Sequence, residues 1–163
     1  MSKYIIFDRD GVLNKDYGYV YRWSVLLHNR DFTRQLGRWR KRGFRFIIVT
    51  NQSGIGRGLY SERHFKTFQT HFSNYYKRFG IRFEAVYYCP HDPLTGCICR
   101  KPSPFLVKKA IMRYKINKSS SIGVGDKITD IQAFKNAGIK NNILFKDNNS
   151  LRSLGYMKYK NII

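Results

Sequence analysis

Acidic residues are scarce in this 163-residue chain, which has 10 Asp and Glu against 31 Lys and Arg and a formal net charge of +21. A charge of this size predicts that the protein attracts polyanions or phosphorylated ligands through a long-range field. A general bias in residue usage explains the same number equally well, because net charge reports on association and not on fold. No basic run is long enough to indicate a nucleic-acid-binding tail.

Long apolar runs are also missing. The first apolar run, Tyr4 to Phe7, ends at Asp8, and no stretch approaches the roughly 20 apolar residues that a membrane span requires. We therefore expect no membrane segment and a cytoplasmic location. A hydrophobic content of 42% in 163 residues is enough for one real core, so a single domain over residues 1–163 is expected.

Cysteine is limited to three residues, an odd number, and all three lie in one short segment, which argues against a disulfide framework. Three thiols and one imidazole form a complete tetrahedral set, and a zinc site with four protein ligands is usually structural. The alternative is a loop with reduced, unligated cysteines. The candidate zinc ligands are Cys89, His91, Cys97 and Cys99.

Short apolar runs alternate with helical patterns along the chain. Strands that alternate with helices predict an α/β fold with a central parallel sheet and helices on both faces. The predicted strands are Tyr4 to Phe7, Phe44 to Val49, Ala85 to Tyr88, Ser121 to Val124 and Ile143 to Phe145. The predicted helices are Asp31 to Arg42, Ser61 to Gly80, Pro104 to Tyr114 and Ile128 to Ala137, and the second carries an aromatic stripe of Phe65, Phe68, Phe72, Tyr75, Tyr76 and Phe79.

Polar side chains follow four of these strands directly: Asp8, Thr50, Cys89 and Asp126. Parallel sheets bind ligands at the carboxyl ends of their strands, so these side chains are expected along one edge. At the first strand end, Asp8 and Asp10 stand two residues apart in a turn that contains Gly11. Two carboxylates in this arrangement suit a nucleophile and an acid.

The segment Asp8-Arg9-Asp10-Gly11 resembles the first motif of the haloacid dehalogenase (HAD) phosphatases. In that family the first Asp attacks phosphorus and the second protonates the leaving oxygen. Three further segments resemble the later motifs in the same order: Thr50-Asn51-Gln52-Ser53, Arg100-Lys101-Pro102 and Gly125-Asp126-Lys127-Ile128-Thr129-Asp130. The resemblance implies a HAD-like Rossmannoid three-layer fold, a Mg²⁺-dependent phosphomonoesterase and a covalent phospho-aspartate on Asp8.

The resemblance also implies the role of each site residue. Thr50 would bind the transferring phosphoryl group and Lys101 would neutralise it. Mg²⁺ would be held by Asp8, by the backbone carbonyl of Asp10 and by Asp126, which are hard oxygen ligands. For Asp130 a local hydrogen-bonding role and a role in the site both stay open. The zinc loop directly precedes Arg100 and Lys101, so it is expected to hold them in position.

A zinc loop between the second and third motifs resembles the branch that contains the D-glycero-D-manno-heptose-1,7-bisphosphate 7-phosphatases and the histidinol-phosphate phosphatases. The heptose group is favoured by two segments, Asp16-Tyr17-Gly18-Tyr19-Val20 and Thr50 to Gly58, whereas the short loop between His91 and Cys97 is closer to the histidinol group. The implied substrate-binding residues are Asp16, Tyr17, Gly18, Tyr19, Asn51, Gln52, Ser53, Arg100 and Lys127.

A polynucleotide 3′-phosphatase is the third alternative, because such HAD enzymes share a similar Thr-Asn-Gln stretch and the charge suits nucleic acid. They lack the zinc cluster, so the expected partner is a small phosphorylated sugar. No insertion is long enough for a cap domain, which predicts an open active site and a monomer. Residues Gly54 to Gly58 match neither a Walker A loop nor a dinucleotide fingerprint and are interpreted as a flexible turn.

Overall fold

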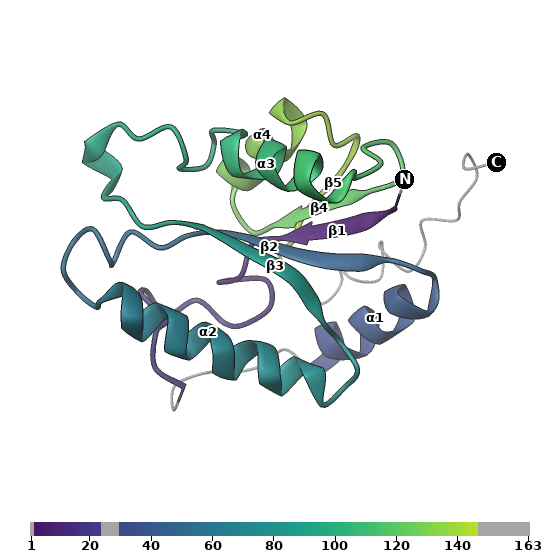
Figure 1. The fold of residues 1–163 in the computed structure, drawn as a ribbon, viewed down its shortest axis with the longest axis horizontal. Helices are drawn as coiled ribbons and strands as arrows, with labels where there is room; N and C mark the ends of the chain where they lie inside the picture. Colours follow the sequence, from purple (N-terminus) through teal and green to yellow (C-terminus); the bar gives the residue numbers. More distant parts are fainter. Residues whose placement is uncertain (1, 24–29, 147–163) are drawn as a thin grey trace.

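The computed structural model describes residues 2–23 and 30–146. In this part of the chain, strands and α-helices alternate as predicted (Figure 1). The strands are β1 (Tyr4–Phe7), β2 (Arg45–Asn51), β3 (Phe83–Cys89), β4 (Ile122–Gly125) and β5 (Asn141–Leu144). The helices are α1 (Arg30–Lys41), α2 (Glu62–Lys77), α3 (Phe105–Tyr114) and α4 (Ile128–Asn136), with a short 3₁₀ helix η2 (Pro93–Thr95).

The five strands form one parallel sheet in the order β3-β2-β1-β4-β5. Strand β1 is central, and its last residue, Phe7, pairs with Ile48 of β2 and with Val124 of β4. The chain first builds outward through β2 and β3 and then returns to the other side of β1. Ligands bind at the carboxyl ends of strands where the order reverses in this way, which places the expected site at the end of β1.

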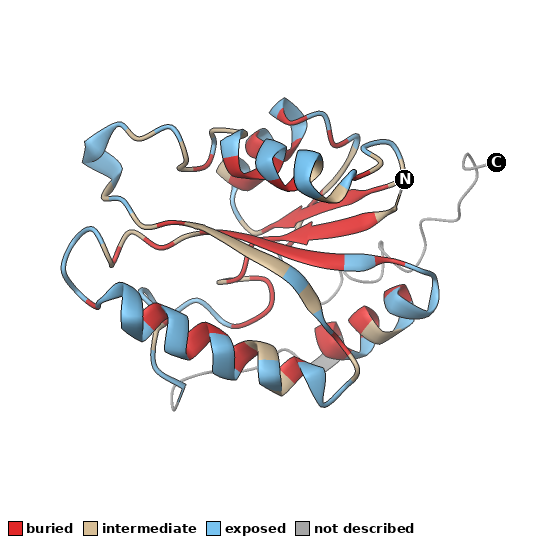
Figure 2. Ribbon diagram, in the orientation of Figure 1, coloured by how far each residue is buried: buried red, intermediate tan, exposed pale blue. Residues whose placement is uncertain are grey.

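Helices α1 and α2 cover one face of the sheet, and α3 and α4 cover the other (Figure 1). Successive strand residues point to opposite faces, so Phe7 belongs to the same buried cluster as Trp39 and Phe72, while its neighbour Ile6 belongs to the cluster that contains Phe134. The buried sides of all four helices face the sheet (Figure 2). The predicted three-layer α/β architecture is confirmed.

The long helix α2 begins where the sequence predicts. The Ser61 hydroxyl accepts from the His64 N–H at 3.2 Å, and the Ser61 N–H donates to the His64 imidazole at 3.4 Å, which satisfies two backbone groups at the helix start. The predicted end at Gly80 was wrong, because the helix ends at Lys77. Phe79 therefore lies beyond the helix and is 52% exposed, so it does not belong to the buried aromatic stripe.

The described residues contain no second sheet, and no α-helix or strand lies between β1 and residue 23. No helix in residues 2–23 and 30–146 is long and apolar enough to cross a membrane. A single domain over the whole chain, a monomeric state and a cytoplasmic location stay predictions.

Candidate active site

Asp8 is the first residue after β1, and the sheet fixes its backbone. Its N–H donates to the Val124 carbonyl at 2.9 Å, so the pairing with β4 continues one residue beyond the strand. Because β1 is central, Thr50 at the end of β2 and Asp126 after β4 flank Asp8 on either side. The structure thus brings these three predicted residues to one edge of the sheet.

The Lys101 ammonium is buried between two carboxylates. Its Nζ lies 2.6 Å from Asp8 Oδ1 and 2.7 Å from Asp130 Oδ1, and it donates to the Val49 carbonyl at 2.8 Å. Burial acts to lower the pKa of Lys101, but the two carboxylates outweigh it and raise that pKa. Lys101 therefore places a fixed positive charge beside Asp8.

Burial also penalises the charged forms of two carboxylates in the site. It raises the pKa of Asp8 to about 7, against the opposing effect of the Lys101 charge. It raises the pKa of Asp126 to about 6, against the opposing effect of Lys127. A bound cation favours the ionised form of a carboxylate, so it would lower the pKa values of both Asp8 and Asp126.

Three carboxylates converge in this region: oxygen atoms of Asp8, Asp126 and Asp130 lie within 4.8 Å of one another. Asp126 Oδ1 is buried and has no hydrogen-bond partner. A Cβ at Gly11 would lie 2.2 Å from Asp126 Oδ2, and φ of Gly11 is +86°, so glycine is required there for the carboxylate to pass. Hard oxygen donors with an unpartnered atom fit a Mg²⁺ ion.

The Asp10 carboxylate is held separately from these three. Arg9 donates from Nε and from one terminal nitrogen to its two oxygens, at 3.0 and 2.8 Å. Asn14 and Gln52 each donate a further hydrogen bond from their side-chain amides at 2.9 Å. The side chain is 15% exposed and lines the cavity described below, so it is oriented by its neighbours and still accessible.

Sequence reasoning gave Arg9 no role, yet it is completely buried. Its guanidinium lies over the rings of Phe65 and Phe68, at 5.6 and 4.7 Å from their centroids, and it donates to the Val20 carbonyl at 2.7 Å. The position of Arg9, between two aspartates and directly after an apolar strand, was the only sequence signal that it could belong to the site. Its contacts on α2 could not be read from the local sequence.

Asp130, whose role the sequence left open, and Tyr60, which was not predicted, are two further residues of the site. Besides its ion pair with Lys101, Asp130 accepts from the Lys127 N–H at 2.9 Å, so it has both the local role and the site role that the sequence left open. The Tyr60 hydroxyl donates to Oε1 of the Gln52 side chain at 2.7 Å. Burial raises the pKa of Tyr60 to about 12, so this hydroxyl remains a donor.

The segment after β2 connects the elements of the site. The Thr50 hydroxyl is buried and accepts from the Gln52 amide at 3.0 Å. Asn51 exchanges two hydrogen bonds with the backbone of Lys101, donating at 3.3 Å and accepting at 3.1 Å. The loop that carries Lys101 is therefore tied to the end of β2.

A cavity of about 530 Å³ opens above these groups. Of the predicted substrate-binding residues, Tyr17 is 51% exposed and is not part of the wall, whereas the others are. Lys127 Nζ lies 3.2 Å from Asp16 Oδ2 at the cavity. The lining residues are Asp8, Asp10, Asp16, Gly18, Tyr19, Asn51, Gln52, Ser53, Tyr60, Arg100, Lys101, Pro102, Lys127, Thr129 and Asp130.

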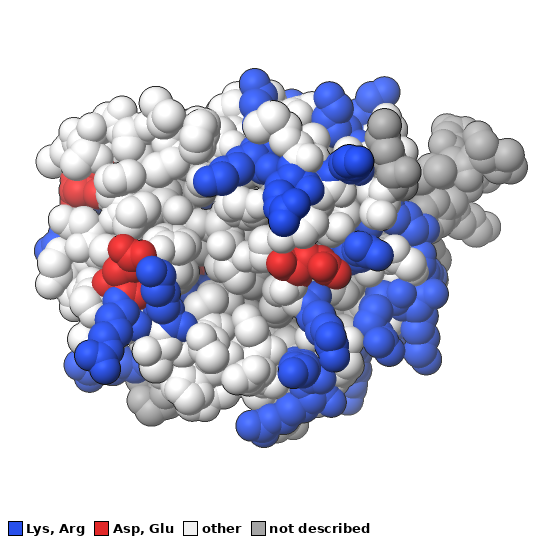
Figure 3. Space-filling model, in the orientation of Figure 1, with Lys and Arg blue, Asp and Glu red and all other residues white. Residues whose placement is uncertain are grey.

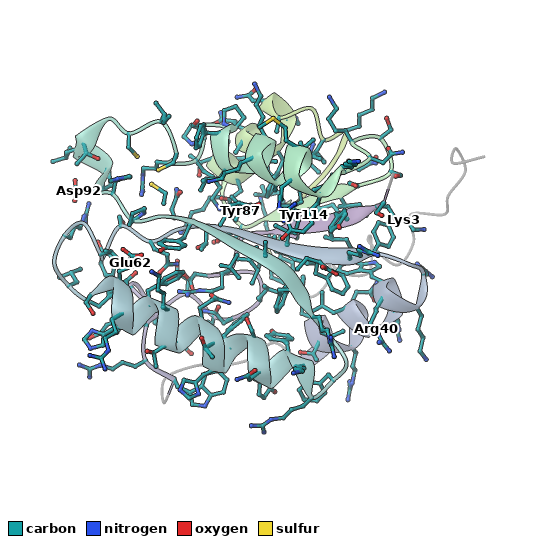
Figure 4. All side chains as sticks on the ribbon, viewed as in Figure 1. Lys3, Arg40, Glu62, Tyr87, Asp92 and Tyr114 are labelled. Carbon is teal, nitrogen blue, oxygen red and sulfur yellow. The ribbon has the colours of Figure 1, made fainter. Side chains whose placement is uncertain are left out.

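The four predicted zinc ligands meet in the loop after β3, here called the metal loop (residues 89–99). The sulfur atom of Cys89 lies 3.4 Å from that of Cys97 and 3.1 Å from that of Cys99, and Cys97 and Cys99 are 3.7 Å apart. His91 Nδ1 lies 3.7 Å from the Cys89 sulfur and 3.2 Å from the Cys99 sulfur. Figure 4 shows sulfur atoms gathered near the labelled Asp92 of this loop.

These distances suit a tetrahedral ion, because Zn–S bonds of about 2.3 Å separate two ligand sulfurs by roughly 3.8 Å. Burial raises the pKa of Cys89 to about 12 and also raises that of Cys99, whereas for Cys97 the hydrogen bonds with these two thiols outweigh burial and lower the pKa to about 6. A thiolate is the form that binds metal. The donor set and its spacing therefore fit zinc.

The chain is similar to known proteins over most of its length. Residues 83–143 match the family model described as haloacid dehalogenase-like hydrolase. A Thermoplasma volcanium protein named probable D-glycero-D-manno-heptose-1,7-bisphosphate 7-phosphatase is 46% identical over 125 residues, covering 77% of this chain and 86% of that protein. A Helicobacter pylori (strain 26695) protein named D-glycero-β-D-manno-heptose-1,7-bisphosphate 7-phosphatase is 34% identical over 148 residues, covering 90% of this chain and 86% of that protein.

A solved structure has the same fold. It is described as D,D-heptose 1,7-bisphosphate phosphatase from B. bronchiseptica complexed with magnesium and phosphate, and it superposes with a TM-score of 0.83 at 29% identity. The superposition covers 96% of this chain and 87% of that one. The chain therefore belongs to the haloacid dehalogenase-like hydrolases, within the family of the heptose-1,7-bisphosphate 7-phosphatases, and is a phosphoric monoester hydrolase.

Proposed function

We propose that this phosphatase hydrolyses the 7-phosphate of D-glycero-D-manno-heptose 1,7-bisphosphate through a covalent phosphate on Asp8. The supporting observation is that one cavity holds Asp8 and Lys101 together with two further cations, Arg100 and Lys127. A bisphosphate needs positive charge at two places, beside the nucleophile and around the phosphate that is retained. The names of the relatives support the sugar.

In the first step, a carboxylate oxygen of Asp8 forms a bond to phosphorus while the bond from phosphorus to the sugar oxygen breaks. Asp10, entering this step protonated, gives its proton to the departing oxygen, so that a neutral alcohol leaves. The Lys101 ammonium, 2.6 Å from Asp8, neutralises charge on the transferring group and orients the nucleophile.

In the second step, Asp10 accepts a proton from a water molecule whose oxygen attacks phosphorus. The bond between phosphorus and Asp8 breaks, inorganic phosphate is released and the Asp8 carboxylate is restored. Asp10 thus acts first as an acid and then as a base. The hydrogen bonds from Arg9, Asn14 and Gln52 keep its carboxylate oriented toward the cavity through both steps.

Asp8, Asp126 and Asp130 are proposed to hold Mg²⁺, with the Asp10 backbone carbonyl as the further contact that the family resemblance implies. When bound, Mg²⁺ neutralises charge on the phosphoryl oxygens. Lys101 forms ion pairs with both Asp8 and Asp130 and so fixes these two carboxylates. Asp126 Oδ1 has no hydrogen-bond partner and is free to bind the ion.

The metal loop is proposed to hold structural zinc. A Cys₃His site has no open position for substrate, so its contribution is positional. Cys99 directly precedes Arg100, and the backbone of Lys101 is tied to Asn51 on the other side. Zinc would fix one end of the segment that presents both cations.

A polynucleotide substrate is the competing explanation of the +21 charge. Figure 3 shows Lys and Arg side chains spread widely over the face that it presents, with few acidic ones. The wide spread fits a general attraction of anions better than one track for a nucleic-acid backbone. We therefore favour a small phosphorylated sugar as the substrate.

Phosphate release with Mg²⁺ from three substrates tests the assignment: heptose 1,7-bisphosphate, histidinol phosphate and a 3′-phosphorylated oligonucleotide. We expect the highest kcat/KM for the heptose bisphosphate, with product analysis showing loss of the 7-phosphate. Histidinol phosphate is included because the loop between His91 and Cys97 is short. A higher kcat/KM for either other compound would refute the sugar assignment and retain the Asp8 chemistry.

A further inference from the structure

The glycine-rich segment after β2, residues 54–58, forms a turn that is fixed against the metal loop. The Gly56 N–H donates to the Pro90 carbonyl at 2.8 Å. A Cβ at Gly56 would lie 2.5 Å from the backbone nitrogen of Asp92 and 2.9 Å from the Pro90 oxygen. The two backbones are therefore in direct contact, which only glycine permits.

Arg57 extends from this turn to two other segments. Its Nε donates to Asp92 Oδ2 at 2.7 Å, in the metal loop. Its NH1 donates to the hydroxyl of Tyr19, and the guanidinium also lies 5.9 Å from the centroid of that ring. The other Asp92 oxygen accepts from the Leu94 N–H at 2.8 Å, which fixes the acceptor.

Tyr19 needs such a support. Its φ is +52°, a left-handed conformation that costs conformational free energy for a residue with a side chain. Tyr19 is 40% exposed and forms part of the cavity wall. A Cβ at Gly54 would lie 2.8 Å from its Cδ1, so the turn also packs against the ring.

The ion pair between Arg57 and Asp92 is partly exposed, with side chains 42% and 22% accessible. Pairs of this kind contribute little to global stability, so stability alone does not account for the arrangement. The guanidinium has several donors in a rigid plane and satisfies two acceptors at once, which a lysine ammonium on a flexible stem does less well. The geometry is that of a positioning contact.

We propose that Arg57 is a specificity-determining positioning residue, which holds Tyr19 in the cavity wall by tethering it to Asp92 of the metal loop. Tyr19 then contacts the sugar portion of the substrate, while the groups at the strand ends act on the phosphate. The assignment of the sugar contact rests on the proposed function. The tether itself rests only on contacts within the protein.

Steady-state kinetics with two substrates test the proposal. Arg57→Ala should raise KM for the heptose bisphosphate about fivefold, the net value of roughly one hydrogen bond, with kcat changed less than twofold. KM for 4-nitrophenyl phosphate, which has no sugar, should change much less. Arg82→Ala, at an exposed arginine before β3, is the matched control and should match wild type on both substrates.

Two further variants separate the tether from general charge. Arg57→Lys should leave KM raised, because one ammonium does not reproduce both contacts; full recovery by lysine would show that charge alone suffices and would overturn the proposal. Tyr19→Phe, which keeps the ring, should raise KM for the sugar, and the Arg57→Ala/Tyr19→Phe double variant should be no worse than either single change. Additive losses would show that Arg57 acts independently of Tyr19.

Hydrogen exchange of the substrate-free protein provides a readout that does not require any substrate. Backbone amides in residues 16–20 should exchange faster in Arg57→Ala than in wild type or Arg82→Ala, with zinc content unchanged. Unchanged exchange, or loss of zinc together with equal kcat losses on both substrates, would overturn the tether. If wild type cleaves 4-nitrophenyl phosphate and not the heptose bisphosphate, the proposed function fails while the exchange result still decides on the tether.

Discussion

Arg9 donates to both carboxylate oxygens of Asp10, the residue that follows it in the chain, at 3.0 and 2.8 Å. The guanidinium is fully buried against aromatic rings of α2, so it cannot follow Asp10 into solvent. A two-pronged contact with a planar cation fixes both the position and the plane of the carboxylate. Arg9 thereby links the packing of α2 to the proposed acid of the reaction.

We predict that Arg9→Lys lowers kcat for the sugar phosphate by about tenfold to a hundredfold, because lysine lacks the planar pair of donors that orients Asp10. The loss should be smaller with an aryl phosphate, whose leaving group needs little protonation.

Asp10→Asn should show the same dependence on the leaving group with a larger loss, of roughly 10²- to 10⁴-fold. Comparing kcat/KM on both substrates checks this, and equal losses would argue against Asp10 as the acid.

Asp8→Asn should abolish turnover and leave the fold intact, because an amide cannot form the acyl phosphate. The variant should unfold at a temperature equal to or above that of metal-free wild type at pH 8, since burial disfavours the Asp8 charge. Steady-state assays and thermal unfolding provide the measurements. Turnover close to wild type would rule out the covalent mechanism.

The affinity for Mg²⁺ should rise with pH between about 5 and 7 and level off above that range. In the cation-free site burial raises the pKa of Asp8 to about 7 and that of Asp126 to about 6, so a cation must displace protons below these values. Calorimetric titration of Mg²⁺ at several pH values measures this slope. A pH-independent affinity would contradict it.

The same shifts predict how the stability of the cation-free protein depends on pH. Both pKa values lie above the ordinary value of 3.8, so between pH 4 and 7 the folded state binds more protons than the unfolded state. Its free energy of unfolding should therefore fall as pH rises through this window. Thermal unfolding in EDTA should show the fall, and excess Mg²⁺ should reduce it.

The two proposed metal ions should differ in how easily a chelator removes them. Mild EDTA should stop activity and Mg²⁺ should restore it, because Mg²⁺ among oxygen ligands exchanges readily, whereas a Cys₃His zinc is held with folding-scale free energy. Elemental analysis of reduced protein should find tightly bound zinc, and Cys99→Ser should lower both zinc content and unfolding temperature. Protein purified without any zinc would refute the structural site.

Salt dependence separates a sugar substrate from a polynucleotide. For a small dianion, kcat/KM should fall only modestly with salt, because few charges are neutralised. For a polynucleotide with six to ten phosphate contacts, affinity should fall by roughly 10³- to 10⁵-fold between 50 and 200 mM salt. We expect the shallow dependence, and a steep one with efficient oligonucleotide turnover would overturn the substrate assignment.

The aromatic stripe of α2 shows where sequence patterns lose accuracy. Phe65, Phe68 and Phe72 are buried as the helical spacing predicts, because that spacing is set by the chain itself. Phe79 has the same apparent spacing and is exposed, because the helix ends at Lys77. The end of a helix depends on the turn that follows it and on packing, and the spacing of apolar residues indicates neither of these.

The sequence alone determined the alternating strands and helices, the carboxylates at the end of β1 and the four candidate zinc ligands of the metal loop, because these features depend on local patterns and on short spacings. The tertiary structure decided which distant residues meet. Lys101 pairs with Asp8 across 93 positions of the chain, and Arg57 joins Tyr19 to Asp92. The burial that shifts the Asp8 pKa arises from the same long-range contacts, since a side chain is desolvated only when segments far apart in sequence pack around it.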